Sequence, residues 1–377
     1  MRKWEMVRLG DVASFNMGQS PSSDSYNNTG EGLPFFQGKT DFGIMYPTVR
    51  IYCTKPKKTA DKYDILISVR APVGTVNIAT ELCCIGRGLA AISQIENISN
   101  FKYLYYYLQY KENEIARMGV GSTFKAISKK DLDAIEIPLP PLPVQQKIAD
   151  VLDRANALIE KRKAQLEKLD LLAKSQFIQM FDENYGTIEL KEICSIITDG
   201  THQPPKFVDY GIPFIFVSNI VNNEILYETN KYISEDDYKT LIKRTPLEIG
   251  DLLLTTVGSY GNPAIVKTTQ KFCFQRHIAY IKPINEIVNT QYLHTAFLCD
   301  LVKRQIDRKV KGVAQKTLNL SDLKTIRIML PPLHLQNQFA AYVEQVEAQK
   351  ALIKQSLELM ELEYKSLMQM CFNGELY

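Results

Sequence analysis

The stretch IEIPLPPLPVQQKIA, residues 135–149, decides the fold because the chain contains it twice. It returns about 190 residues later as IRIMLPPLHLQNQFA, residues 326–340. Upstream, DILISVRAPVG from Asp64 pairs with DLLLTTVGSYG from Asp251, and RGLAAI from Arg87 pairs with RHIAYI from Arg276. A long period with only two copies argues against a solenoid, which needs three or more short repeats. The sequence therefore predicts two similar domains related by a pseudo-twofold axis.

A long helical pattern follows each copy of this stretch. Residues 144–181 contain neither Gly nor Pro, and apolar residues recur at heptad spacing from Ile148 to Ala173. This spacing is typical of a coiled-coil helix, and the preceding pair Pro140 and Pro141 disfavours helix upstream. At about 1.5 Å per residue, such a helix would be about 57 Å long. The second copy predicts an equivalent helix over residues 335–377.

The apolar seams of the two helices differ at corresponding places. Ile159 of the first helix corresponds to Lys350 of the second, and Arg162 corresponds to Ile353. Unlike seams favour an antiparallel pair within one chain over two separate homodimer contacts. We expect such a pair to hold the domains at opposite ends, as a ruler would. A plain interdomain linker or a homodimer zipper is the alternative interpretation.

Composition narrows the class of protein. The 377 residues are 45% apolar, which is enough for packed cores in two or three domains. No run approaches the roughly 20 apolar residues of a membrane span, and the start, MRKWEMVRLGD, is too charged for a signal peptide, so we expect a cytoplasmic protein. Seven cysteines without a Cys-x-x-Cys pair, and four histidines, predict neither a disulfide framework nor a zinc site. A formal charge of +3 excludes a bulk polycation that coats nucleic acid.

The expected fold class is α+β. We predict globular domains of mixed α and β structure over residues 1–143 and 182–334, separated by the long helices at residues 144–181 and 335–377. Short apolar runs bounded by Gly, Pro and Asn predict strands at residues 64–69, 212–217 and 251–257. Helical patterns cover residues 101–117 and 290–308. The copies differ most over residues 19–62 and 198–244, the loop-rich parts, where recognition usually varies on a shared scaffold.

The motifs of common enzymes are incomplete in this chain. GVGSTFK from Gly119 lacks the spacing of a phosphate loop. The dipeptide Pro204-Pro205 lacks the flanking residues of an adenine methyltransferase site, and no catalytic triad or two-carboxylate pattern is evident. We therefore expect a noncatalytic protein, without a cofactor or a metal of its own.

A nucleic-acid reader is better supported by the residues. Each domain places Arg or Lys beside hydroxyl or amide side chains in presumed loops, and these groups suit base edges and phosphates. The candidate DNA-binding residues are Gln19, Ser20, Ser22, Lys39, Arg70 and Lys125 in the first domain, and Thr201, His202, Gln203, Lys206, Asn219 and Lys316 in the second. For each of them, a merely solvated loop residue is the alternative. Arg87 and Arg276 occupy equivalent places, and internal salt bridges that hold the sheet are one interpretation of them.

These residues resemble the specificity subunit of type I restriction-modification systems over essentially the whole chain. The most specific marks are GSTFKAISKKDLDAIEIPLPPLPVQQ and GVAQKTLNLSDLKTIRIMLPPLHLQN, each followed by a long helix, with GQSPSSDSY, DILISVRAPVG and TDGTHQPPKF in the domains. The second copy departs from the pattern, with GVAQ in place of GST and HLQN in place of a charged-QQ sequence.

The resemblance implies a division of labour among subunits. Two target recognition domains would each read one half of an asymmetric bipartite site in double-stranded DNA, and the helices would set the spacer. Two modification subunits would dock on the helices, bind S-adenosylmethionine and methylate adenine, and restriction subunits would use ATP and Mg²⁺ to translocate and cut DNA. The rival interpretation is a coiled-coil scaffold that never touches DNA, and it gives no reason for similar domain frames with divergent loops.

Overall fold

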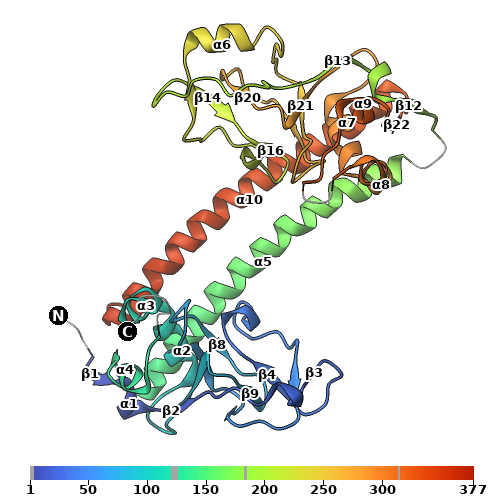
Figure 1. Cartoon of the computed structure of the whole chain (residues 1–377). Helices are drawn as coiled ribbons and strands as arrows, with labels where there is room; N and C mark the ends of the chain where they lie inside the picture. The colour runs from blue at the N-terminus through green and yellow to red at the C-terminus, as the bar shows by residue number, and fades with distance from the viewer. Residues whose placement is uncertain (1–3, 120–125, 182–184, 313–314) are drawn as a thin grey trace. The chain divides into compact units, whose positions relative to one another are not determined.

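The long helices are shared between two compact units. The computed structural model describes residues 4–119, 126–181, 185–312 and 315–377. Unit 1 comprises Met1–Lys163 with Gln355–Tyr377, and unit 2 comprises Ala164–Lys354. Helices α5 (Leu142–Met180) and α10 (Leu333–Asn373) confirm the two predicted long helices. Because each helix crosses the division, each unit combines one globular part with a segment of both helices (Figure 1).

The core of unit 1 is a four-stranded antiparallel sheet in the order β2-β10-β7-β8. Its strands are β2 (Ala13–Met17), β7 (Ile65–Ser68), β8 (Val76–Ile78) and β10 (Leu89–Gln94). Strand β7, which confirms the strand predicted near residues 64–69, is buried throughout. Ile65 and Ile67 face the helical side of the sheet, whereas Leu66 packs into a separate apolar cluster. Both faces are therefore covered, as a continuous apolar run predicts.

A second sheet of short strands packs beside it, in the order β3-β5-β4-β9-β6. It contains β3 (Tyr26–Asn27), β4 (Leu33–Phe36), β5 (Tyr52–Cys53), β6 (Thr59–Ala60) and β9 (Cys83–Ile85), with the short turns η1 (Ser23–Ser25) and η2 (Lys39–Asp41). This sheet is built largely from the region that the sequence marks as loop-rich. The variable part of the domain is therefore anchored on strands.

Short helices close the other side of unit 1. They are α1 (Leu9–Val12), α2 (Phe101–Tyr110), α3 (Glu112–Met118) and α4 (Lys129–Asp133), beside the pair β1 (Met6–Arg8) and β11 (Glu136–Pro138). The helix predicted as continuous over residues 101–117 is broken. Lys111, at φ −92° and ψ 3°, ends α2, and α3 then turns so that Ile115 is buried in the core.

Unit 2 repeats this architecture with the sheet order β13-β21-β18-β19. These strands are β13 (Cys194–Asp199), β18 (Leu252–Thr255), β19 (Pro263–Ile265) and β21 (Ile278–Pro283). The other strands are β12 (Thr187–Glu189), β14 (Ile212–Ile215), β15 (Ile220–Val221), β16 (Glu224–Ile225), β17 (Tyr232–Ile233), β20 (Cys273–Phe274) and β22 (Arg327–Met329). Strands β14 and β18 confirm the strands predicted over residues 212–217 and 251–257. The duplication is thus a duplication of fold.

The helices of unit 2 are α6 (Glu235–Leu241), α7 (Thr290–Leu298), α8 (Asp300–Lys309) and α9 (Leu320–Lys324), with the short turns η3 (Leu190–Glu192) and η4 (Val217–Asn219). Helices α7 to α9 follow the same plan as in unit 1, whereas α6 has no counterpart among the helices of unit 1. The predicted helix over residues 290–308 breaks at Cys299, whose extended backbone at φ −81° and ψ 148° separates α7 from α8. It breaks where its counterpart in unit 1 does.

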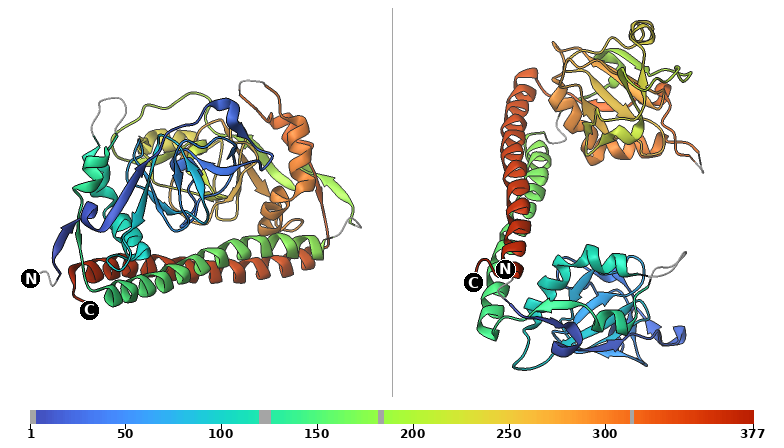
Figure 2. Two further views of the ribbon diagram at one scale, coloured as in Figure 1. Left: turned by 90° about the horizontal axis from the view of Figure 1, so that it is seen from below. Right: turned by 90° about the vertical axis from the view of Figure 1, so that its left-hand side faces the viewer.

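Within each unit the two long helices run antiparallel (Figures 1 and 2). In unit 1 the Lys163 ammonium lies 3.2 Å from a Glu361 carboxylate oxygen. In unit 2 the Lys350 ammonium lies 2.7 Å from an oxygen of Asp170. Residue numbers rise along α5 as they fall along α10, which confirms the antiparallel pairing inside each unit. Lys350, at the apolar position of Ile159 in the other seam, is thereby compensated by a carboxylate.

Two further features concern the chain as a whole. All seven cysteines carry free thiols, in agreement with the prediction of no disulfide framework. Over the described ranges, the helices do not combine the length and the apolar character that crossing a membrane requires.

Candidate nucleic-acid interface

Four chain segments meet at one end of the main sheet of unit 1, and we call this place the first loop corner. Its segments are residues 18–20, 36–39, 69–70 and 86–88. Backbone hydrogen bonds join them. These bonds run from the N–H groups of Gly18, Gln19, Gly86 and Val69 to the carbonyl oxygens of Leu89, Ile85, Phe36 and Gly88, at 2.9, 3.1, 2.8 and 2.9 Å. The corner is therefore held by main-chain bonds and does not depend on which side chains it presents.

Close backbone approach explains the glycines at this corner. A Cβ on Gly18 would lie 2.2 Å from the carbonyl oxygen of Gly86, and one on Gly88 would lie 2.3 Å from that of Gln37. Both distances are far inside van der Waals contact, so any side chain there would push the segments apart. The glycines fix how closely the loops converge.

Four of the six residues predicted to bind DNA in the first domain lie at this corner: Gln19, Ser20, Lys39 and Arg70. The side chains of Gln19, Lys39 and Arg70 are exposed, and the Ser20 hydroxyl accepts the N–H of Arg87 at 3.3 Å. Ser22 lies apart from them, where its carbonyl oxygen accepts the N–H and the hydroxyl of Ser25. Lys125 lies outside the described residues. The role of each in DNA binding stays a prediction.

Unit 2 builds a second loop corner with the same bonds in the same order. Its segments are residues 200–203, 215–217, 256–258 and 275–277. The N–H groups of Gly200, Thr201, Gln275 and Thr256 donate to the carbonyl oxygens of Ile278, Phe274, Ile215 and His277, at 3.2, 3.1, 3.1 and 2.9 Å. The two corners thus share one pattern of backbone hydrogen bonds. Each residue of the first corner can therefore be matched with a residue of the second.

Equivalent positions at the two corners carry unlike side chains. Gln19 corresponds to Thr201, and Gly88 corresponds to His277, because each pair makes the same backbone bond. The bridge of Arg70 to Ala126 in unit 1 is matched by that of Val257 to Thr317 in unit 2. One scaffold therefore presents an amide, a glycine and a guanidinium in one unit, and a hydroxyl, an imidazole and an isopropyl group in the other.

The predicted residues of the second domain divide into three places. Thr201, His202 and Gln203 line a pocket of about 330 Å³ together with Arg244. Lys316 joins the same corner, since its carbonyl oxygen accepts the Gly258 N–H at 3.0 Å. Lys206 is exposed on the segment that follows the pocket. Of the three cations named here, Arg244 lines the pocket, together with Thr201, His202 and Gln203.

Asn219 lies elsewhere and is engaged within its own turn. Its Oδ1 accepts the Phe216 N–H at 3.0 Å, and its Nδ2 donates to the carbonyl oxygens of Leu226 and Glu228 at 3.2 and 2.9 Å. Both ends of the amide are thus bound to backbone. Its contact with DNA stays a prediction, and such a contact would use the second lone pair of Oδ1 or replace one of these bonds.

Two arginines near the corners were missed by the sequence analysis. Arg244 donates to the buried carboxylate of Asp199, which also lies 3.0 Å from the His202 imidazole. Arg50 donates to the buried carboxylate of Asp41, whose other oxygen accepts the Gln37 N–H at 2.7 Å. In each case a fixed anion orients a half-exposed guanidinium. No spacing in the sequence indicates these pairs, because the partners come together only through loops of unrelated length.

The interpretation of Arg87 and Arg276 as internal salt-bridge residues is wrong. Both side chains are exposed, and across the described part of the chain neither guanidinium has a carboxylate ion-pair partner. Arg276 donates instead from Nε to Nε2 of His277, at 3.3 Å. Burial, together with the charge of Arg276, holds the pKa of His277 below its ordinary value, which favours the neutral imidazole that accepts this bond.

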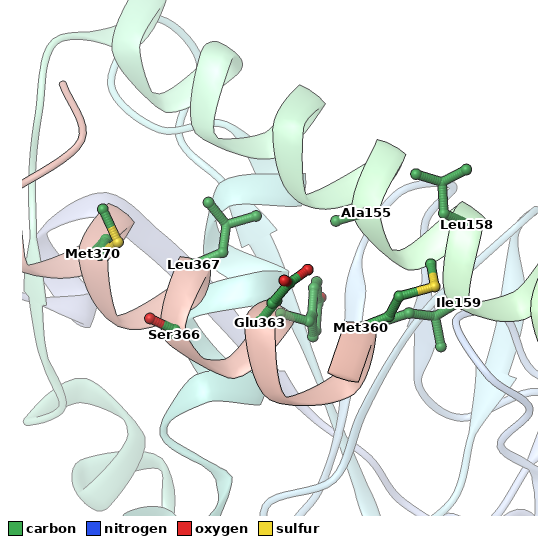
Figure 3. A pocket seen from close by; sticks show the side chains of 9 residues that line it. Ala155, Leu158, Ile159, Met360, Glu363, Ser366, Leu367 and Met370 are labelled. Atoms are coloured by element: carbon green, nitrogen blue, oxygen red, sulfur yellow. The ribbon is translucent and has the colours of Figure 1, made fainter. Parts of the chain in front are cut away.

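A second surface lies on the long helices of unit 1. An apolar groove of about 360 Å³ runs between α5 and α10, with Glu363 and Ser366 as the polar members of its lining (Figure 3). Its other lining residues are Ala155, Leu158, Ile159, Met360, Tyr364, Leu367 and Met370. The buried hydroxyl of Tyr364 has no hydrogen-bond partner among the residues that the structure describes. Leu158 is 55% exposed, and Leu362, further along α10, is 66% exposed.

Comparison with known proteins was made for the whole chain. Residues 1–168 and 182–362 match the family model of the type I restriction modification DNA specificity domain. The chain is 54% identical over 171 residues to MjaX of Methanocaldococcus jannaschii, a predicted type I restriction enzyme specificity subunit. That match covers 44% of this chain and 40% of that protein, so it spans less than half of the relative.

Two other matches cover nearly the whole chain. The type I restriction enzyme EcoBI specificity subunit of Escherichia coli is 25% identical over 417 residues, covering 99% of this chain and 86% of its own length. The crystal structure of a type I restriction-modification system S subunit from M. genitalium has a TM-score of 0.58 at 17% identity, covering 98% of this chain and 96% of that one. This last likeness supports the fold.

Proposed function

Because this chain belongs to the type I restriction modification DNA specificity family, we propose that each of its domains reads one half of an asymmetric bipartite DNA sequence. Double-stranded DNA is the ligand, and the loop corners are the reading surfaces. The observation that carries the proposal is the pair of corners, with one hydrogen-bond plan and unlike side chains. A shared frame keeps the approach to DNA alike, and different donors select different bases.

The residues at the corners suit this task. At the first corner, Arg70 and Gln19 offer multiple donors to guanine and adenine edges, and Lys39 offers a charge to phosphate. At the second corner, Arg244 and His202 are held by Asp199 at the mouth of a pocket. A guanidinium whose orientation is fixed before binding loses less freedom on forming its bonds than a free side chain does. Unlike half-sequences follow from unlike corners.

The long helices serve the rest of the complex in this proposal. The groove between α5 and α10 exposes apolar surface that a monomer ordinarily buries, so it supports docking of a modification subunit. Exposed Leu171, Ile178 and Leu352 extend apolar surface along the helix segments of unit 2, and a second modification subunit would dock there. The continuous helices α5 and α10 would set the spacer between the half-sequences.

Catalysis belongs to the partners in this scheme. Modification subunits would hold S-adenosylmethionine and transfer the methyl group to adenine, and restriction subunits would use ATP and Mg²⁺. This chain would direct both to one sequence in the cytoplasm, where the DNA is. The residues of this chain would bind the DNA, orient it and discriminate between half-sequences.

The experiment that tests the proposal is a methylation map. The chain is co-expressed with a type I modification subunit from the same genome, in a host without adenine methylation, and N6-methyladenine is mapped across that host's DNA. A single bipartite motif with a fixed gap is expected. Unmodified DNA from an assembled complex with S-adenosylmethionine bound would instead favour a coiled-coil scaffold.

A further inference from the structure

We propose that Arg87 and Arg276 are equivalent phosphate-binding anchors, which hold each domain on the DNA backbone whatever half-sequence that domain reads. The inference rests on the proposed function and deepens it. It separates the residues that position the domains from those that specify bases. Neither arginine is among the residues that the sequence analysis assigned to DNA.

The first observation is where Arg87 sits. It lies in the tight turn between β9 and β10, where the N–H of Leu89 donates to the carbonyl oxygen of Gly86 at 3.0 Å. Its own N–H donates to the Ser20 hydroxyl at 3.3 Å. With Gly86 and Gly88 packed against neighbouring backbone, the turn cannot shift without disrupting the first loop corner. The Cα of Arg87 is therefore fixed while its side chain projects to solvent.

Arg276 occupies the same turn of unit 2. The N–H of Ile278 donates to the carbonyl oxygen of Gln275 at 3.1 Å, and the N–H of Arg276 donates to the carbonyl oxygen of Thr201 at 3.0 Å. Ser20 and Thr201 belong to equivalent segments, so both arginines are tied to the segment that leaves the first strand of the main sheet. The structure thus gives both domains an arginine on the same rigid support.

Among the residues that the structure describes, no carboxylate forms an ion pair with Arg87 or Arg276. Arg87 acts on the phenol of Tyr26, whose pKa is raised by burial and by Cys53 and Cys84, and the arginine opposes that rise. The Arg276 guanidinium meets a neutral imidazole. By contrast, the guanidinium groups of Arg50 and Arg244 each form an ion pair with a buried aspartate. An exposed guanidinium without a counter-ion is available to an external anion.

The presence of an arginine at the equivalent position of both corners indicates that the external anion is a DNA phosphate. Beside the arginines the two corners differ, with Gly88 against His277 and Gln19 against Thr201. Residues that read unlike half-sequences are expected to differ, whereas the phosphate backbone is common to both half-sites. An arginine kept at both corners, where its neighbours Gly88 and His277 differ, therefore fits a phosphate and not a base. Each such contact releases condensed counterions, which makes its effect measurable through salt.

The test measures the affinity of the assembled complex with modification subunits against KCl concentration. One duplex carries the motif that the wild-type complex methylates, and a second duplex of equal length has both half-sequences scrambled. Arg87→Gln and Arg276→Gln should each reduce the slope of log K against log salt by about 0.9, and the double variant by about twice that. At 0.1 M salt each should weaken binding by roughly tenfold on both duplexes. The methylated motif should stay the same.

Matched controls lie before the first strand of each main sheet, whereas the loop corners lie after it. Arg8 precedes β2 and is paired with Asp11, and Lys191 precedes β13 and is paired with Glu189. Arg8→Gln and Lys191→Gln remove one positive charge each, and should leave the salt slope unchanged. Arg87→Lys and Arg276→Lys keep the charge and should keep the slope. A salt slope reduced as much in the lysine variants as in the glutamine variants would assign the arginines a structural role and overturn the proposal, because the charge is kept.

The remaining outcomes are also decisive. A salt slope unchanged in the glutamine variants would overturn the anchors. A loss confined to the motif duplex, with one motif position relaxed in the methylation map, would make the arginine a base reader, so the anchor proposal would fail while the proposed function stands. A wild-type complex that shows no preference for the motif duplex would remove the proposed function itself.

Discussion

The buried side chain of Gln145 holds the backbone of Asn100 in place. Its Oε1 accepts the Asn100 N–H at 2.9 Å, and its Nε2 donates to the carbonyl oxygens of Pro140 and Ile98 at 2.9 and 3.0 Å. Asn100 in turn caps α2, because its Oδ1 accepts two backbone N–H groups of the first turn. One amide therefore joins the start of the long helix α5 to the start of α2.

Unit 2 contains the same arrangement. Gln336 accepts the N–H of Asn289 at 2.9 Å and donates to the carbonyl oxygens of Pro331 and Ile287 at 2.8 and 3.2 Å. Both glutamines are fully buried. The stretch that the sequence repeats at residues 135–149 and 326–340 thus contains the glutamine that connects each long helix to its domain.

Replacing Gln145 by Leu should destabilise the chain strongly. The change leaves the Asn100 N–H and two carbonyl groups without partners in the core, which costs about 3 kcal/mol in the free energy of unfolding. Urea unfolding of the full chain measures it. The neighbouring Gln146→Leu removes two exposed bonds, one to the Asn100 side chain and one to Asp150, and should cost less than about 1 kcal/mol. Equal costs for the two variants would contradict the structural role of Gln145.

Replacing Asp199 by Asn should relax recognition of one half-sequence. The change removes the anion that orients Arg244 and His202, while the pocket around them stays. Methylation mapping should show degeneracy in the half assigned to the second domain and an unchanged first half. Asp209→Asn, at an exposed position of the same loop-rich region, should leave the motif intact. If both half-sequences changed together, Asp199 would not be acting through the second corner.

Replacing Leu158 by Glu should prevent docking of the modification subunit on unit 1. The carboxylate would have to be desolvated in an apolar groove, and we expect at least a tenfold weaker association. Co-purification and the stoichiometry of the complex measure this. Ala157→Glu places the same charge on the next exposed residue of α5, outside the groove lining, and should associate normally. Normal association of both variants would place the docking surface elsewhere.

Removing one heptad from each long helix should shorten the spacer. Deleting residues 162–168 and 352–358 removes about 10 Å of helix rise, which corresponds to about three base pairs of DNA. Methylation mapping should return the same half-sequences with a smaller gap. Inserting a heptad at both places should enlarge the gap, and an unchanged gap in either variant would show that the helices do not set it.

Stability should fall between pH 7 and pH 5 partly through His294. Its ring lies on α7, its Nδ1 is buried without a hydrogen-bond partner among the described residues, and burial lowers its pKa to about 4. Because the unfolded chain, with a pKa near 6.5, binds the proton more readily, acidification favours unfolding by about 2 kcal/mol at pH 5. The raised pKa values of the buried carboxyls Asp64 and Asp251 act in the opposite direction.

The contribution of His294 is isolated by comparing variants. His294→Phe should lose about 2 kcal/mol of the pH dependence of unfolding, since Phe does not titrate, and Asp64 and Asp251 are unchanged in it. His334→Gln alters an exposed histidine, and should follow the wild type. Urea unfolding at the two pH values measures both. A pH dependence unaltered in the Phe variant would show that His294 does not titrate in this range.

The sequence predicted the parts of the fold that depend on periodicity. The heptad spacing and the Pro-Pro pair placed α5 within two residues of its start at Leu142, because an apolar stripe has only one way to pack in a helix pair. The helix breaks at Lys111 and Cys299 were missed, since each depends on the dihedral angles of one residue and on burial behind it. The spacing of apolar residues along the chain does not indicate such a break.

The candidate site was predictable only in part. Gln19, Ser20, Lys39 and Arg70 converge because backbone bonds draw their segments to one corner, whereas the sequence placed them in loops and did not indicate that these loops meet. The orienting pair of Asp199 and Arg244 could not be found, because the two residues are 45 positions apart and meet only after the intervening loop folds. Contacts of this kind, formed only in the folded loops, decide which side-chain hydrogen-bond donors are free to bind DNA and which are already bonded within the protein.

The division of the chain into units constrains how the protein is made. Unit 2 is one continuous stretch, Ala164–Lys354, and can fold as soon as it leaves the ribosome. Unit 1 needs Gln355–Tyr377 beside Met1–Lys163, and residues Met368, Cys371 and Phe372 of that last segment are buried in its core. The core of unit 1 therefore cannot be completed until the last segment of the chain has been synthesised. A chain shortened by premature termination would lack the buried side chains that complete this core.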